Sequence, residues 1–98
     1  MTAALLSEKQ IAQKMKSVKG WKRNGGEIYR TYIMKDFVQA MGFVQSVAFF
    51  AEKADHHPDI DIRWNKVTLV LSTHSEGGLT EKDFSLAALF NSLIKSHA

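Results

Sequence analysis

Two adjacent histidines, His56 and His57, lie between acidic residues and a proline in the segment EKADHHPDID, residues 52–61. An imidazole exchanges protons near about pH 6.5, so a group of histidines can donate and accept protons close to neutral pH. A nearby carboxylate favours the protonated form of the ring and can orient it. The segment therefore indicates acid-base chemistry or metal binding, provided that the fold brings a further histidine close.

A predicted hairpin supplies that further histidine. Residues 59–64 alternate between polar and apolar side chains and residues 67–71 are mostly apolar, which is typical of two neighbouring strands. If the two-residue loop is 65–66, counting outwards along both strands pairs His57 with His74. By parity both histidines lie on the sheet face opposite the isoleucines of the first strand, a face that helices need not cover.

Acidic residues surround the predicted cluster. Glu52 stands four residues before His56, so the two side chains share a face if the preceding helix persists that far. The carboxylate can then orient or charge the imidazole, and Asp55, Asp59 and Asp61 add negative charge nearby. Proton transfer near neutral pH is the chemistry that this arrangement favours.

Three segments have the apolar periodicity of helices. The first follows a capping box at Ser7 and ends before Gly20, the second follows Asp36 and ends before the histidine pair, and the third follows Thr80, which has capping-box spacing to Asp83. We expect the second helix to be the most buried. Its predicted buried face consists of Phe37, Ala40, Met41, Val44, Ala48 and Ala51, and the residues that widen it are Val38, Phe43, Val47, Phe49 and Phe50.

The order of elements defines the expected fold. Residues 27–34 are rich in β-branched and aromatic side chains and follow an Asn-Gly-Gly turn, which predicts a first hairpin with the residues around Trp21. The second hairpin follows the second helix. We therefore predict an α+β fold of order αββαββα, with a four-stranded antiparallel sheet and three helices packed on one face. Residues 1–98 form one domain in this prediction.

Composition excludes several classes of function. The 98 residues contain no cysteine, which excludes a disulfide, a zinc ribbon and a thiol nucleophile. The longest apolar run, residues 47–51, is too short to span a membrane, and we expect a soluble cytoplasmic protein that could also enter the nucleus. The net charge of +3 reflects lysines and arginines near the N-terminus, which we interpret as a solvated helix face rather than a nucleic-acid site.

Several residues between positions 52 and 83 have a spacing that resembles the signature of the pterin-4a-carbinolamine dehydratases. They are Glu52, His56, His57, Pro58, Trp64, His74 and Asp83. The length and the element order resemble the family over the whole chain. The resemblance implies dehydration of a 4a-hydroxytetrahydropterin to the quinonoid dihydropterin, a step of tetrahydrobiopterin recycling that needs no metal or organic cofactor.

The resemblance also implies roles for individual residues. His56 and His74 are expected to transfer protons, and His57 to bind the substrate and share in proton transfer. Glu52 is the expected orienting carboxylate, and Asp83 supports the catalytic group. The expected substrate-binding residues are His57, Trp64, Ser72 and Thr73. Taken alone, Asp83 is interpreted as a helix cap, Trp64 as a core residue and His97 as a residue without a role.

Two other classes of function stay open. Three histidines could bind zinc with an open fourth position, although adjacent histidines in a strand would point to opposite faces. A binding module is the second alternative, because animal relatives of the family are dimerisation cofactors of a homeodomain transcription factor. The resemblance further implies a homo-oligomer, a tetramer built as a dimer of dimers, and no direct contact with nucleic acid or membrane.

Overall fold

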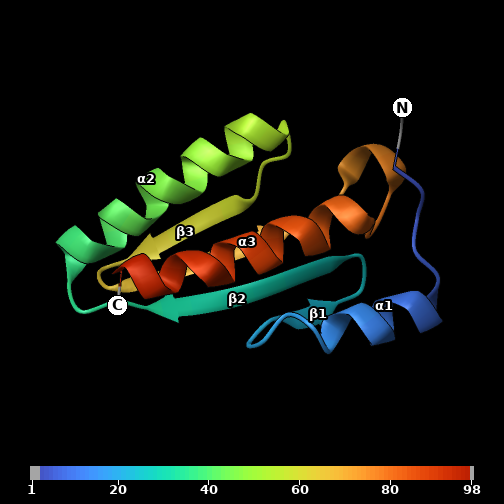
Figure 1. Cartoon of the computed structure of the whole chain (residues 1–98), viewed down its shortest axis with the longest axis horizontal. Coiled ribbons are helices and arrows are strands. Elements are labelled where there is room, and N and C mark those ends of the chain that lie inside the picture. Colours follow the sequence, from blue (N-terminus) through green and yellow to red (C-terminus); the bar gives the residue numbers. More distant parts are fainter. Residues whose placement is uncertain (1–2, 98) are drawn as a thin grey trace.

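Four antiparallel strands form one sheet, and two long helices lie side by side over one of its faces (Figure 1). The computed structural model describes residues 3–97. In chain order the elements are α1 (Glu8–Met15), β1 (Lys22–Asn24), β2 (Glu27–Ile33), α2 (Phe37–Ala54), β3 (Asp59–Arg63), β4 (Lys66–Leu71), the 3-10 turn η1 (His74–Glu76) and α3 (Glu81–His97). The predicted α+β fold and its order αββαββα are confirmed.

The sheet has the strand order β1-β2-β4-β3, so β2 and β4 form its centre. Their alternate side chains, apart from the partly buried Arg30, are buried beneath α2 and α3, because a strand presents every second residue to the same face. The core contains Ile28, Tyr32, Phe43, Val47, Val67, Leu69, Leu71, Ala87 and Phe90. Among residues 3–97 no helix covers the opposite face of the sheet (Figure 1).

The starts of α1 and α2 follow the predicted caps, whereas α1 ends at Met15 and not just before Gly20. Ser7 and Gln10 form both bonds of a capping box, and the Asp36 carboxylate accepts the Gln39 backbone N–H at 2.8 Å. Helix α2 ends at Ala54 because Asp55 adopts the left-handed conformation, with φ of 51°, which aspartate tolerates better than most residues. The chain therefore leaves the helix before the two histidines, as predicted.

The register of the second hairpin differs from the prediction by two residues. Ile60 pairs with Leu69 and Arg63 pairs with Lys66, so the loop is 64–65 rather than 65–66. Asn65 decides this position, because it is buried and its Nδ2 donates to the Met34 carbonyl at 2.9 Å. The prediction of Trp64 as a core residue is wrong, since Trp64 occupies the loop with φ of 53° and is 65% exposed.

The buried face of α2 is narrower than the predicted one and includes two residues that were expected only to widen it, Phe43 and Val47. Its buried residues are Ala40, Phe43, Val47 and Ala51. Four large apolar side chains of the helix are exposed and define what we name the α2 apolar surface: Phe37, Val38, Met41 and Phe49. The expectation that α2 is the most buried helix is wrong, because α3 buries Asp83, Phe84, Leu86, Ala87 and Phe90. Within residues 3–97 no helix is long and apolar enough to cross a membrane.

Candidate active site

Three segments converge beyond one end of the sheet and enclose a pocket of about 420 Å³, which we name the histidine pocket. They are the turn that follows α2, the end of β4 with η1, and the first turn of α3. The pocket is lined by Asp55, His56, His57, Ser72, Thr73, His74, Ser75 and Lys82. The fold thus brings the three predicted histidines together with the predicted residues Ser72 and Thr73.

The His56 ring is held by Asp83. The Nε2 atom of His56 lies 2.7 Å from Oδ1 of Asp83, and the two side chains are 11% and 0% exposed. The other carboxylate oxygen of Asp83, Oδ2, accepts the Thr80 backbone N–H at 2.9 Å and the Thr73 hydroxyl at 2.8 Å. Asp83 therefore caps α3, as predicted from its spacing to Thr80, and at the same time fixes a histidine of the pocket.

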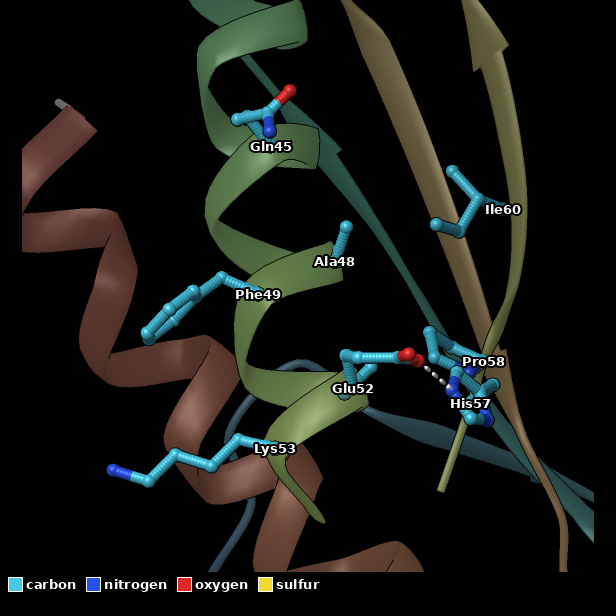
Figure 2. Close-up of a pocket in the computed structure, with 9 residues that line it drawn as sticks. Gln45, Ala48, Phe49, Glu52, Lys53, His57, Pro58 and Ile60 are labelled. Atoms are coloured by element: carbon cyan, nitrogen blue, oxygen red, sulfur yellow. Dashed lines mark hydrogen bonds and ion pairs between the residues drawn. The ribbon is translucent and has the colours of Figure 1, made fainter. Parts of the chain in front are cut away.

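The His57 ring makes a similar contact in a different environment. Its Nε2 lies 2.7 Å from Oε1 of Glu52, and these side chains are 55% and 81% exposed. Figure 2 shows Glu52 reaching from α2 towards His57. The predicted pairing of Glu52 with His56 is wrong, because the left-handed Asp55 ends the helix and turns His56 away from it towards α3.

His74 begins η1 and is exposed at the wall of the histidine pocket. The predicted cross-strand pair of His57 with His74 is wrong in register, since both residues lie beyond the ends of β3 and β4. His57 also does not lie on the uncovered sheet face, because its ring contacts Glu52 of α2. The histidines meet because the start of β3 and the end of β4 lie side by side.

Trp64 is not part of this cluster. It lies in the loop at the opposite end of the β3–β4 hairpin from the histidines. Sequence reasoning identified Thr80 only as the cap of α3, and it missed the pocket residues Ser75 and Lys82. The contact of Thr80 with Thr73, 2.7 Å between the hydroxyl oxygens, could not be found by spacing, because it depends on the turn that links β4 to α3. The His97 side chain lies outside the described part of the structure.

A second hollow, of about 650 Å³, adjoins the histidine pocket and separates α2 from β3 (Figure 2). Its wall is mainly apolar and includes Ala48, Phe49, Pro58 and Ile60. His57 lines both hollows, so it stands between a polar pocket and an apolar groove. Among the described residues no three His, Asp or Glu side chains form a group that could hold a metal ion.

A family model supports the resemblance that the sequence suggested. Residues 4–93 match the model described as "Pterin 4 alpha carbinolamine dehydratase". The chain belongs to the pterin-4a-carbinolamine dehydratase family. A Roseiflexus castenholzii relative named "Putative pterin-4-alpha-carbinolamine dehydratase" is 54% identical over 92 residues, which are 94% of this chain and 99% of the relative. A Nocardia farcinica relative of the same name is 50% identical over 95 residues, 97% of this chain and all of the relative.

Solved structures share the fold. A Brucella melitensis protein described as a transcriptional coactivator/pterin dehydratase is 37% identical, with a TM-score of 0.87 over 90% of this chain and 96% of that one. A pterin dehydratase-like protein described as a RuBisCO assembly factor in the alpha-carboxysome is 19% identical, with a TM-score of 0.62 over 74% and 84% of the two chains. The second likeness shows the fold alone.

Proposed function

We propose that this protein is a 4a-hydroxytetrahydropterin dehydratase that forms the quinonoid dihydropterin and water. The observation that carries the proposal is the meeting of three histidines in one pocket of a member of this family, with two of them paired to carboxylates. Hydroxide is a poor leaving group, so an acid must protonate the 4a-oxygen while a base accepts the proton from N5. Histidines serve both tasks near neutral pH.

The burial of each pair supports a division of roles. His56 is nearly buried and held by Asp83, which suits a proton-transfer residue that needs a fixed orientation. His74 lines the same pocket and is the proposed second proton-transfer residue. His57 has an exposed ring and an exposed carboxylate partner, which suits substrate binding with a share in proton transfer. Glu52 and Asp83 act through these rings and are positioning residues.

Two hydroxyl groups of the pocket, those of Ser72 and Thr73, are already engaged as donors. Ser72 donates to the Gly26 carbonyl at 2.7 Å, and Thr73 donates to Asp83. Because a hydroxyl has only one proton, a substrate meets Ser72 as an acceptor. The amino group and the ring N–H of a pterin are donors, so they suit this oxygen. We therefore keep Ser72 as a substrate-binding residue and assign Thr73 mainly to the support of Asp83.

We also propose that the protein assembles as a homotetramer, a dimer of dimers. The α2 apolar surface and the unpaired outer edge of β3 are the two surfaces that support this proposal. Within one chain Trp64 is far from the histidine pocket, so its predicted contact with the substrate requires a neighbouring subunit. Light scattering at micromolar concentration tests the assembly, and a monomer would refute it.

The catalytic proposal is tested with 4a-hydroxytetrahydropterin generated in the cuvette by an aromatic amino acid hydroxylase. We expect the protein to accelerate the loss of this compound above the spontaneous rate, and to do so equally after dialysis against a strong chelator. A rate no faster than the spontaneous background would refute the proposal. Loss of activity that stoichiometric zinc restores would instead support the three-histidine metal alternative.

The location of the protein in the cytoplasm stays a prediction.

A protein-binding role is the second candidate, and the exposed α2 apolar surface is the observation that favours it. The description of the Brucella melitensis relative names both a coactivator and a dehydratase. Affinity purification with Val38→Glu, whose new charge lies on this surface, separates the roles. A partner that is lost in this variant while both the assembled mass and the dehydratase activity persist would establish a binding role distinct from self-assembly and from catalysis.

A further inference from the structure

Asp83 is the centre of a buried hydrogen-bond network that extends behind the histidine pocket. Its carboxylate is fully buried, and the two threonines that reach it, Thr73 and Thr80, are 3% and 0% exposed. Oδ1 faces His56, while Oδ2 accepts from the Thr73 hydroxyl and from the Thr80 backbone N–H. The hydroxyl oxygens of the two threonines lie 2.7 Å apart.

The number of protons fixes the direction of this network. A threonine hydroxyl has one proton, and that of Thr73 is donated to Asp83. In the contact between the two hydroxyls, Thr80 must therefore be the donor. The Thr80 oxygen in turn accepts the backbone N–H of Lys82 at 3.3 Å. The hydrogen bonds thus point from Thr80 through Thr73 to Asp83. Their direction cannot reverse, because the backbone N–H of Lys82 at the start can only donate.

The same count determines the state of His56. Two donors already occupy Oδ2, which leaves Oδ1 as the oxygen available to the histidine. An ionised carboxylate only accepts hydrogen bonds, so Nε2 of His56 must carry a proton. In the neutral ring the lone pair is then on Nδ1. We propose that the Thr80–Thr73–Asp83 chain holds His56 in the Nε2–H tautomer and so makes Nδ1 the atom that exchanges protons with the substrate.

Thr80 is the informative member of the chain. It is fully buried and does not line the histidine pocket, and the proton of its hydroxyl points along the chain to Thr73 and Asp83. The sheet contains a matched control, because the hydroxyl oxygens of Thr31 and Thr68 lie 2.8 Å apart in β2 and β4, and neither residue lines the pocket. Thr80 and Thr73 are positioning residues in this proposal. The expected effect of the proposal on kcat rests on the proposed dehydratase function.

The tautomer is tested directly on the wild-type protein labelled with 15N-histidine, at a pH where the ring is neutral. The ring signals of His56, assigned by their loss in His56→Gln, should show a protonated Nε2 and an unprotonated Nδ1. The opposite pattern would overturn the proposal. This measurement needs neither a threonine variant nor activity, so it decides the proposal even if the wild-type protein fails the dehydratase assay.

The chain is tested with Thr80→Val, which removes the hydroxyl while keeping the shape of the side chain. We expect kcat to fall about 3- to 10-fold with little change in KM, the effect of weakening one buried hydrogen bond, and a second His56 tautomer to appear in the spectrum. Thr73→Val should lower kcat further, by about 10-fold or more, because it removes a donor to the carboxylate itself.

Conservative variants distinguish this role from a structural one. Thr80→Ser keeps the hydroxyl and should restore kcat to within about 2-fold of the wild type, whereas Thr68→Val should change neither kcat nor the His56 signals. Native circular dichroism confirms that each variant is folded. If folded Thr80→Val and Thr73→Val both keep the wild-type kcat and the wild-type ring signals, the chain does not set the tautomer and the proposal is wrong.

Discussion

Replacing Asp83 with Asn changes one oxygen into an amide nitrogen and leaves the shape of the side chain intact. Thr73 and the Thr80 backbone both donate to Oδ2, so the amide oxygen of the variant must occupy that position. The amide nitrogen then faces Nε2 of His56, 2.7 Å from the present oxygen, and donates to it. The ring can accept that bond only by moving its own proton to Nδ1, which leaves Nδ1 without a lone pair for the substrate.

The burial of the pair sets the magnitude. A hydrogen bond to a charged group contributes about 1.5 to 3 kcal/mol, and the His56–Asp83 pair is nearly inaccessible to water. Its loss corresponds to about 10- to 150-fold in rate, and complete loss of the proton transfer would reach about 10⁴-fold. We expect Asp83→Asn to lower kcat by about 10²-fold or more and to destabilise the protein by about 1 to 3 kcal/mol.

Glu52→Gln is the matched comparison, because the Glu52–His57 pair has the same length but lies in solvent. Exposed ion pairs contribute about 0.2 to 1 kcal/mol, so kcat/KM should fall less than about 5-fold. The small effect should shrink further in 1 M salt, which screens exposed charges.

Both variants are assayed side by side for kcat and KM, and for the free energy of unfolding in urea. The burial argument fails if Glu52→Gln lowers kcat as much as Asp83→Asn does. It also fails if folded Asp83→Asn retains kcat within about 5-fold of the wild type.

Three further predictions concern other parts of the molecule. His74→Ala should lower kcat by about 10² to 10⁴-fold without loss of fold, while His97→Ala should be silent; equal kinetics of both would remove His74 from the mechanism. Burial raises the pKa of Tyr32 to about 12, above the value of about 10 in an unfolded chain, so its stabilising effect is complete below pH 10 and is lost towards pH 12. Urea titrations should show this loss, about 3 kcal/mol, in the wild type but not in Tyr32→Phe. Val38→Glu should lower the assembled mass seen by light scattering, and an unchanged mass would exclude the α2 apolar surface as an interface.

Local signals in the sequence predicted the fold well, because they act over a few residues. The capping residues Ser7 and Asp36 begin helices where their spacing indicated, and the Asn-Gly-Gly turn joins β1 to β2. The loop of the second hairpin was misplaced by one residue, which shifts the pairing of the strands by two, because Asn65 bonds to Met34, 31 positions earlier in the chain. A contact of that range has no signature in the sequence around the turn.

The site was predicted at the level of its residues but not of its contacts. Glu52 was assigned to His56 by helix spacing, whereas the left-handed Asp55 transfers that contact to His57. The partner of His56 is Asp83, which lies 27 positions away and which spacing marked as a helix cap. Which carboxylate meets which ring depends on the backbone conformation of one residue, and helical periodicity does not contain that information.

The double role of Asp83 has a consequence for heat inactivation. The first turn of a helix is usually among the first parts of a protein to fray. In α3 the same carboxylate closes that turn and holds His56, so fraying there would release the histidine even while the sheet stayed intact. On heating, enzymatic activity should then be lost when this one turn unfolds, before the rest of the protein does. Mutations that rigidify the start of α3 should raise the temperature at which activity is lost, without any change in the pocket.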